Sequence, residues 1–227
     1  MEQNKTEHKW YFNPSCTLAV CRPAYVEQWM DVLQKAEPSI QLHTVCCKSP
    51  HGLPDGSVVV NHCSGCNRRF DAQEGLSAVT VWEVLDQMED FPLPQYGPMT
   101  VTVHDSCAFR DRPKVHDAVR SLLRKMGITI VEAERSREKS VCCGGSKYGT
   151  ISPEEMFSMQ KRRAKQMPCQ LVAVTCPSCM KSMAIGGKTP VYLPDLIFGK
   201  KTDVGELNWD KYRQAVTAYQ KANREAK

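Results

Sequence analysis

The sequence of 227 residues has no apolar stretch near the roughly 18 residues that a membrane-spanning helix needs. Residues 1–10 are polar and charged, and they lack the apolar region of a secretory signal. We therefore expect a cytoplasmic protein without direct membrane insertion, in a compartment that keeps thiols reduced. The net charge is only +5, and its densest basic run is predicted to be a solvated helix face: Lys161, Arg162, Arg163 and Lys165. No nucleic-acid partner is predicted.

Two cofactor motifs are missing as well. The chain has no G-x-G-x-x-G, so we expect no flavin or nicotinamide site in it, and it lacks the C-x2-C-x2-C-x3-C run of ferredoxins. What the chain does have is twelve cysteines. Disulfide frameworks of this cysteine count are typical of small secreted proteins. Metal ligation or redox chemistry is therefore favoured over structural thiols or disulfides.

Ten of the twelve cysteines form two copies of one pattern, in which a lone cysteine precedes a vicinal pair and then a C-x-x-C. The first copy comprises Cys16, Cys46, Cys47, Cys63 and Cys66, and the second comprises Cys107, Cys142, Cys143, Cys176 and Cys179. A proline-rich segment at residues 91–98 separates the copies. We therefore predict a cysteine-rich half at residues 1–97 and a second half, with a C-terminal helix, at residues 98–227. Cys21 and Cys169 lie outside the pattern, although Cys21 is near enough to Cys16 to replace it.

Each copy also shows strands alternating with helices. In the second copy, residues 99–103 and 128–131 are predicted strands, and Pro113 opens an amphipathic helix between them. In the first copy, Pro23 opens a helix and residues 40–45 form the next strand. The apolar runs at 58–60 and 171–174 are predicted as buried third strands. This order indicates an α/β fold with parallel sheets flanked by helices, and the cysteines follow the strands, so we expect the metal sites at the carboxyl ends of the strands.

Five thiols in one set do not match the common metal sites. A zinc site needs four ligands, and an ordinary four-iron cube needs four thiolates. Adjacent side chains point apart, so a vicinal pair suits two neighbouring metal atoms. The fifth thiol indicates either an opened cluster with a bridging thiolate or a spare redox thiol. Gly144 and Gly145 follow the second pair, and we predict that they let the backbone approach a cofactor and give N–H groups to its sulfurs.

The second copy reads His104-Asp105-Ser106-Cys107, then Cys142-Cys143-Gly144, then Cys176-Pro177-Ser178-Cys179. This layout resembles the cysteine-rich CCG domain, and in particular the family of heterodisulfide reductase B subunits; the resemblance covers both copies. It implies two pseudo-repeated Rossmann-like halves, an anaerobic setting, and one or two noncubane [4Fe-4S] clusters, each held by the five cysteines of one copy. It also implies an oxidoreductase of the disulfide reductase type, in which paired clusters cleave a substrate disulfide.

The first copy departs from the family pattern in two ways. Its vicinal pair is followed by Lys48 where the family has a glycine. Only 15 residues separate Cys47 from Cys63, whereas 32 separate Cys143 from Cys176. The second copy uses this length for a helix with Ser152 as the predicted N-cap, and the first copy has a loop at residues 49–56. The cluster type at the first site is therefore left open.

The main functional hypothesis is a thiol/disulfide-converting protein of a larger complex, which acts on a small thiol or disulfide and receives electrons from a ferredoxin-like iron–sulfur partner. His104, His62 and Lys48 are the candidate catalytic helpers, and Arg110 and Arg112 are candidates for guiding an anionic thiol. One alternative is a non-catalytic electron-transfer module of a dehydrogenase complex. The other is a structural zinc protein.

Overall fold

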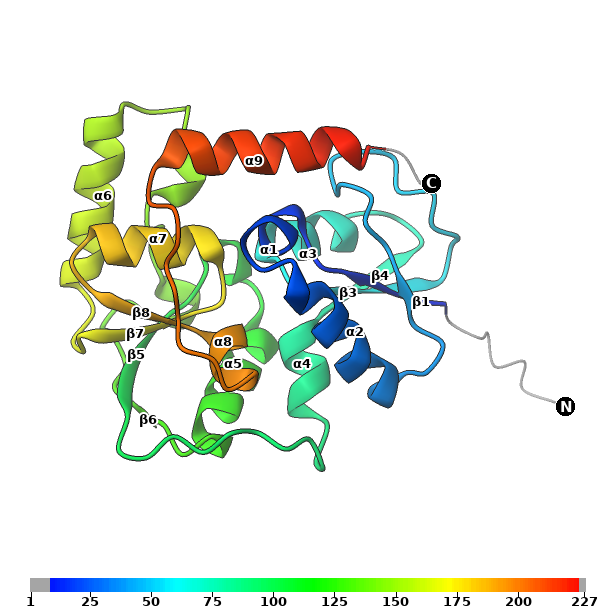
Figure 1. Ribbon diagram of the computed structural model, residues 1–227, viewed down its shortest axis with the longest axis horizontal. Coiled ribbons are helices and arrows are strands. Elements are labelled where there is room, and N and C mark those ends of the chain that lie inside the picture. The colour runs from blue at the N-terminus through cyan, green and yellow to red at the C-terminus, as the bar shows by residue number, and fades with distance from the viewer. Residues whose placement is uncertain (1–8, 225–227) are drawn as a thin grey trace, which may run out of the picture. The chain divides into compact units, whose positions relative to one another are not determined.

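The structure is a computed structural model that describes residues 9–224, and it divides into two compact units. One unit comprises Met1–Met88 with Gln214–Lys227, and the other comprises Glu89–Arg213. The chain can be followed in Figure 1. Most of the N-terminal stretch in which no export signal is expected, residues 1–8, lies outside the described residues. The division into halves at residues 97 and 98 stays a prediction.

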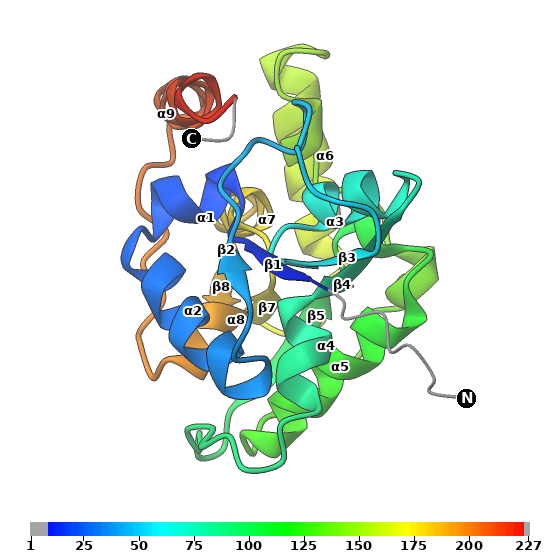
Figure 2. The ribbon, with the colours of Figure 1, turned by 90° about the vertical axis from the view of Figure 1, so that its right-hand side faces the viewer.

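The first unit is built on a four-stranded parallel sheet in the order β2-β1-β3-β4 (Figure 2). Its strands are β1 (Trp10–Asn13), β2 (Gln41–Leu42), β3 (Ser57–Asn61) and β4 (Leu76–Thr80). Its helices are α1 (Cys16–Cys21), α2 (Ala24–Ala36), α3 (Ser64–Asp71) and α4 (Val81–Asp86). All five residues of β3 are buried, as expected for a central parallel strand covered on both faces. Between α2 and α4, Trp29 and Trp82 pack edge to face with ring centroids 5.8 Å apart.

The second unit repeats this plan with the order β6-β5-β7-β8, again all parallel. Its strands are β5 (Thr100–His104), β6 (Thr129–Ile130), β7 (Leu171–Val174) and β8 (Thr189–Tyr192). Its α-helices are α5 (Pro113–Lys125), α6 (Pro153–Lys165), α7 (Pro177–Ile185) and α8 (Leu193–Ile197), and its 3-10 turns are η1 (Cys107–Phe109), η2 (Arg137–Lys139) and η3 (Gly145–Lys147). The last helix, α9 (Trp209–Ala222), crosses the division between the units at Arg213.

The predicted fold class is confirmed, because both halves are parallel sheets flanked by helices and have the same strand order. The halves differ at one crossover: α6 connects the second and third strands of the second half, whereas residues 43–56 form a helix-free loop in the first. The predicted N-cap of α6 is also confirmed, since the Ser152 hydroxyl accepts the backbone N–H of Glu155 at 3.1 Å. The strand predicted at 40–45 is shorter than expected, since β2 ends at Leu42.

Two further expectations can be compared with the structure. None of the helices within residues 9–224 combines the length and the apolar character that a membrane span requires. The prediction that the basic run of α6 is a solvated face is wrong for one residue. Lys161, Arg162 and Lys165 are exposed, but Arg163 is 1 % exposed, because it lies on the same face as the buried Met156.

Candidate metal centre

The strand order fixes where a ligand would sit in the second half. The direction of the crossovers reverses between β5 and β7, and ligands of open parallel sheets bind beyond the carboxyl ends of the strands at such a point. Cys107 begins the turn η1 three residues after β5, and Cys176 is the N-cap residue of α7, two residues after β7. The sheet therefore delivers two of the predicted ligands to the two sides of the switch point.

The vicinal pair reaches the same place through a tight turn. Gly144 has φ of +91°, a left-handed conformation that a side chain would strain, and its N–H donates to Cys142 Sγ at 3.3 Å. The N–H of Gly145 hydrogen bonds to Cys143. A Cβ at Gly144 would come within 3.1 Å of the Met156 carbonyl oxygen. The turn thus brings two backbone donors to the sulfurs, and the contact that limits the size of Gly144 is with α6.

The five thiols of the second half form one connected set. Hydrogen bonds link Cys107 to Cys142, Cys142 to Cys143, Cys143 to Cys179, and Cys179 to Cys176. The Cys143 and Cys179 sulfurs are 3.6 Å apart, and both residues are buried. Segments that are far apart in the sequence therefore bring all five predicted ligands together.

Negative charge in this set is best accommodated at Cys142. Hydrogen bonds from Cys107 and Cys143 lower the pKa of Cys142, and the Ser146 hydroxyl, 3.2 Å away, and the Gly144 N–H add to the effect. The same contacts raise the pKa of Cys107, and they raise that of Cys143 to about 12. Sulfurs this close cannot all ionise without a compensating cation, which is the condition that a bound metal satisfies.

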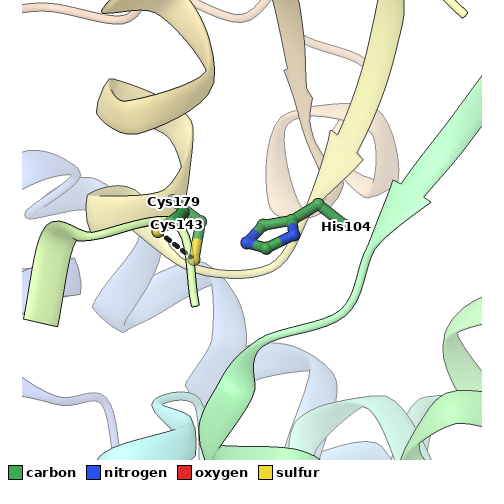
Figure 3. Close-up of side chains that lie close together, drawn as sticks. All are labelled: His104, Cys143 and Cys179. Atoms are coloured by element: carbon green, nitrogen blue, oxygen red, sulfur yellow. Dashed lines mark hydrogen bonds between the residues drawn. The ribbon is translucent and has the colours of Figure 1, made fainter. Parts of the chain in front are cut away.

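A histidine lies beside two of these thiols, Cys143 and Cys179 (Figure 3). His104 ends β5, is 2 % exposed, and offers a ring nitrogen within 4.8 Å of the Cys143 and Cys179 sulfurs. Its Nδ1 accepts a hydrogen bond from Arg163 Nε at 3.2 Å, so the ring proton is on Nε2. Figure 3 shows Nε2 on the side of the ring that faces Cys143. Burial lowers the pKa of His104 to about 3, and Arg163 adds to the shift, so the ring is neutral near pH 7.

Arg163 is the functional residue that the sequence-based interpretation missed. Its guanidinium donates to Gln166 Oε1 at 2.8 Å, to the Arg135 carbonyl at 2.9 Å and to Ser140 Oγ at 3.1 Å, as well as to His104. These partners are all neutral. A buried cation held only by neutral groups is costly unless anions lie nearby. Asp105 is the strongest such influence on Arg163, and the sulfurs of Cys143 and Cys179 add to it when they carry charge. Its place on the buried face of α6, with Met156, Gln160 and Ala164, was the available signal.

An ion-pair network holds the loop that carries Cys107. Asp105 is buried and makes a two-pronged pair with Arg120, at 2.8 and 3.0 Å, and Arg120 makes a second pair with Glu132. Asp105 also accepts the backbone N–H of Arg137 at 2.6 Å, and its carbonyl accepts the Ser140 hydroxyl. Burial raises the pKa of Asp105, but the Arg120 hydrogen bonds outweigh burial and hold it below the ordinary value.

The first unit assembles its five thiols in the corresponding places. Cys16 begins α1 after β1, Cys63 is the N-cap residue of α3 after β3, and Cys66 lies in the first turn of α3. Cys47 and Cys63 both hydrogen bond to Cys66. A small cavity of about 10 Å³ is lined by four of the thiols and by residues of β1, α9 and the loop after β2: Asn13, Pro14, Ser15, Cys16, Thr44, Val45, Cys46, Cys47, Cys66 and Tyr219.

The polar residues around the first set of thiols differ from those around the second set. Cys16 Sγ accepts a hydrogen bond from Gln220 Nε2 at 3.2 Å, while burial raises its pKa to about 11. A hydrogen bond from Cys66 lowers the pKa of Cys63 to about 6, and Arg69 adds to the shift. At the position of His104, three residues before the lone cysteine, the first unit has Asn13, whose amide donates to the His43 and Val45 carbonyls.

The remaining candidates lie outside the thiol sets. His62 is buried, with its ring 5.2 Å from that of Trp82, and burial lowers its pKa to about 3. Lys48 is exposed directly after Cys47. Cys21 lies at the C-terminal end of α1 and does not line the cavity of the first set. Cys169 precedes β7, at the opposite end of the strand from Cys176.

These donor sets fit an iron–sulfur group. Thiolates are soft ligands that suit iron–sulfur clusters, and each set offers five of them with buried members and local N–H donors. A single tetrahedral ion would leave one thiol of each set unused.

Comparison with known proteins points the same way. The family model of the cysteine-rich domain CCG matches residues 101–184, which span β5 to α7. The "Probable membrane-anchored ferredoxin" of Chromohalobacter salexigens is 30 % identical over 92 residues, 39 % of this chain and 14 % of that protein. The "Probable iron-sulfur-binding oxidoreductase FadF" of Bacillus subtilis is 32 % identical over 94 residues, 39 % of this chain and 13 % of that protein.

A third relative is named as part of a heterodisulfide reductase, as the resemblance implied. The D subunit of the dihydromethanophenazine:CoB--CoM heterodisulfide reductase of Methanosarcina barkeri is 30 % identical over 108 residues, 43 % of this chain and 26 % of that protein. Because this relative is the D subunit, an assignment to the B subunits is narrower than the comparisons support. The chain matches about a quarter or less of the length of each of these relatives. Together the findings support an iron–sulfur redox protein in which residues 101–184 match the family model of the cysteine-rich domain CCG.

Proposed function

We propose that this chain is the thiol/disulfide-converting component of a heterodisulfide reductase-like system and holds one or two noncubane [4Fe-4S] clusters. The observation that carries the proposal is the connected set of five thiols in the second half. Its ligands are Cys107, Cys142, Cys143, Cys176 and Cys179. A second cluster is proposed on Cys16, Cys46, Cys47, Cys63 and Cys66, with the two cysteine-rich halves divided at residues 97 and 98.

The reaction is the reduction of a small disulfide. Two electrons and two protons break the S–S bond of R–S–S–R′ and give R–SH and R′–SH, and a ferredoxin-like iron–sulfur partner supplies the electrons. The cluster, when bound, supplies iron that captures a substrate sulfur and passes on electrons. We place the protein in the cytoplasm, where such partners and reduced thiols are found.

The chain's own residues position and balance the sulfurs. The N–H groups of Gly144 and Gly145 hold Cys142 and Cys143. His104 is neutral and carries its proton on the nitrogen that faces Cys143, so its role is to donate a hydrogen bond rather than to transfer a proton as an imidazolium. Lys48 is the exposed candidate for proton delivery at the first set.

Anaerobic purification with iron and acid-labile sulfide analysis tests the cofactor. We expect iron and sulfide in equal amounts, and Cys143→Ala should remove the iron of one cluster. The matched control is Cys169→Ala, which deletes a thiol outside both sets and should change nothing. Unchanged iron in the Cys143 variant, or zinc without iron in the parent protein, contradicts the proposal.

A second function is favoured by the relative named as a ferredoxin, namely an electron-transfer module without a substrate. Electron paramagnetic resonance of the loaded protein distinguishes the two functions. A thiol that binds at an iron site should alter the spectrum, and reduced protein should convert a small disulfide. If the spectrum does not change when thiols are added and no disulfide is converted, the chain is assigned to electron transfer.

A further inference from the structure

A hollow of about 350 Å³ opens beside Cys142 in the second unit. This volume lies within the range of small-molecule pockets. Its lining combines one ligand thiol, four arginines and three uncharged side chains: Arg110, Arg135, Val141, Cys142, Met159, Arg162, Arg163 and Gln166. No aspartate or glutamate is among these lining residues. The hollow thus places a strong positive charge next to a sulfur of the proposed cluster.

The four arginines have different tasks. Arg163 is buried, and its three guanidinium nitrogens already donate to His104, Gln166, Ser140 and the Arg135 carbonyl. It therefore forms part of the wall of the hollow and does not bind the ligand. Arg110 is anchored by its Nε, which donates to the Ser140 carbonyl at 2.6 Å. Arg135 and Arg162 are exposed, and within residues 9–224 no carboxylate pairs with either guanidinium. Their guanidinium groups are therefore available to a ligand.

We propose that this hollow, lined by Arg110, Arg135 and Arg162 around Cys142, binds a small anionic disulfide or thiol through its carboxylate, sulfonate or phosphate groups. Guanidinium groups bind such anions through paired hydrogen bonds that a neutral group of the same shape cannot reproduce. The anionic class stands on the pocket alone, and the disulfide part rests on the proposed function. Arg112, which the sequence placed with Arg110, is not among the lining residues.

Arginines beside thiolates have another task open to them, which is to balance the charge of the sulfurs. Arg163 is placed for that, since it is buried and close to Cys143 and Cys179. Arg135 and Arg162 are exposed, where solvent weakens their effect on buried sulfurs. A ligand test can separate the two tasks, because charge balance changes cluster retention whereas anion binding changes the preference between ligands.

The probes are 3,3′-dithiodipropionate, a disulfide with two carboxylates, and its diamide, which has nearly the same shape and no charge. Calorimetry on the cluster-loaded protein under anaerobic conditions should show the diacid binding about tenfold or more tightly than the diamide. Arg135→Gln and Arg162→Gln should each weaken the diacid about threefold to tenfold and leave the diamide unchanged. Arg124→Gln removes an arginine of α5 that is also exposed but does not line the hollow, and this variant should bind the diacid as the parent does.

Three results overturn the proposal: equal binding of diacid and diamide, an unchanged ratio in both glutamine variants, or the same loss in Arg124→Gln. If the variants lose iron but keep the ratio, the arginines balance charge and the pocket assignment is wrong. If the protein reduces both probes equally well, the proposed function stands and the pocket assignment is wrong. If it binds the diacid through Arg135 and Arg162 but never reduces it, the pocket assignment stands and the proposed reductase function is contradicted.

Discussion

The two halves of the chain place five thiols at the same edge of the same kind of sheet but surround them differently. In the second half, α6 brings the buried cation Arg163 and, through it, fixes the tautomer of His104. The first half has a loop in place of α6 and Asn13 in place of His104, and the amide of Asn13 bonds to backbone carbonyls. One topology therefore assembles the same ligands with unequal compensation of their charge.

This difference separates what the fold supplies from what the local sequence supplies. Strand order and helix starts place the thiols, and both halves share them. The electrostatic surroundings of the thiols come from residues that have no counterpart in the other half. Examples are Arg163 on α6, which donates to His104, and Gln220 on α9, which donates to Cys16. We expect two such sites to differ in potential and in access even with identical ligands.

The largest effect is expected from the buried ion pair between Asp105 and Arg120 in the second half. At the position of Asp105, two residues before the lone cysteine, the first half has the uncharged Pro14. Arg120→Leu leaves the buried Asp105 without its partner, so the free energy of unfolding should fall by about 3–5 kcal/mol. Urea denaturation, followed by a spectroscopic signal from the second unit, measures the change in the free energy of unfolding.

Its control is the double variant Asp105→Asn with Arg120→Leu, which removes the unpaired charge together with its partner. We expect the double variant to be more stable than Arg120→Leu alone. If the single variant costs less than about 1 kcal/mol, the network does not hold the Cys107 loop.

The second prediction concerns acid stability in the first half. Burial lowers the pKa of His43 to about 4, and His51 adds to the shift, whereas the unfolded value is about 6.5. The unfolded chain therefore binds more protons than the folded chain between pH 4 and 6.5, so folding stability falls as the pH is lowered through this window. His43→Phe keeps the aromatic contacts with Tyr11 and Phe70, and it should lose roughly 2–3 kcal/mol less over the same window.

The measurement is the slope of unfolding free energy against pH for reduced, cluster-free protein, which is insensitive to a constant change in packing. His51→Gln is the control: it removes the neighbouring charge but leaves His43 to titrate, so most of the slope should remain. Equal slopes for the parent and His43→Phe would show that His43 takes up its proton at the same pH in the folded and unfolded states, which contradicts the lowered pKa.

The third prediction tests why one half has a glycine after the vicinal pair and the other a lysine. Gly144 has a positive φ, and a Cβ there would meet Met156 and Met159, whereas Lys48 has an ordinary negative φ. Gly144→Ala should therefore cost about 1–3 kcal/mol. Lys48→Gly, which gives the first half the family's motif, should cost less than about 1 kcal/mol. A cost for Lys48→Gly that matches Gly144→Ala would mean that the two turns are not different.

Sequence patterns predicted the parallel sheets, the start of α6 and the grouping of the thiols, because periodicity and capping are local and cysteines are chemically distinctive. Arg163 could not be recognised by charge alone, since it stands in a run of four basic residues whose other three members are exposed. The pairing of Asp105 with Arg120 joins residues of different elements, and no local rule specifies it. The length of β2 depends on its pairing with β1, and β1 pairs with β2 only at Gln41 and Leu42.

The smallest effect is expected where the halves differ by one hydrogen-bond donor, at His104 and Asn13. The Nε2–H of His104 faces Cys143, so it favours added electron density on the sulfurs, whereas the Asn13 amide is occupied by two carbonyls. His104→Asn should lower the midpoint potential of the second site by some tens of millivolts, about the worth of one hydrogen bond of roughly 1 kcal/mol. Redox titration followed by electron paramagnetic resonance measures it, and His43→Phe should leave that signal unmoved. Because Nδ1 is held by Arg163, Arg163→Lys should shift the potential in the same direction if its role is to orient the ring. A potential that is unchanged in His104→Asn, with iron content retained, would make the two halves equivalent at this position and leave Arg163 as a structural residue of α6.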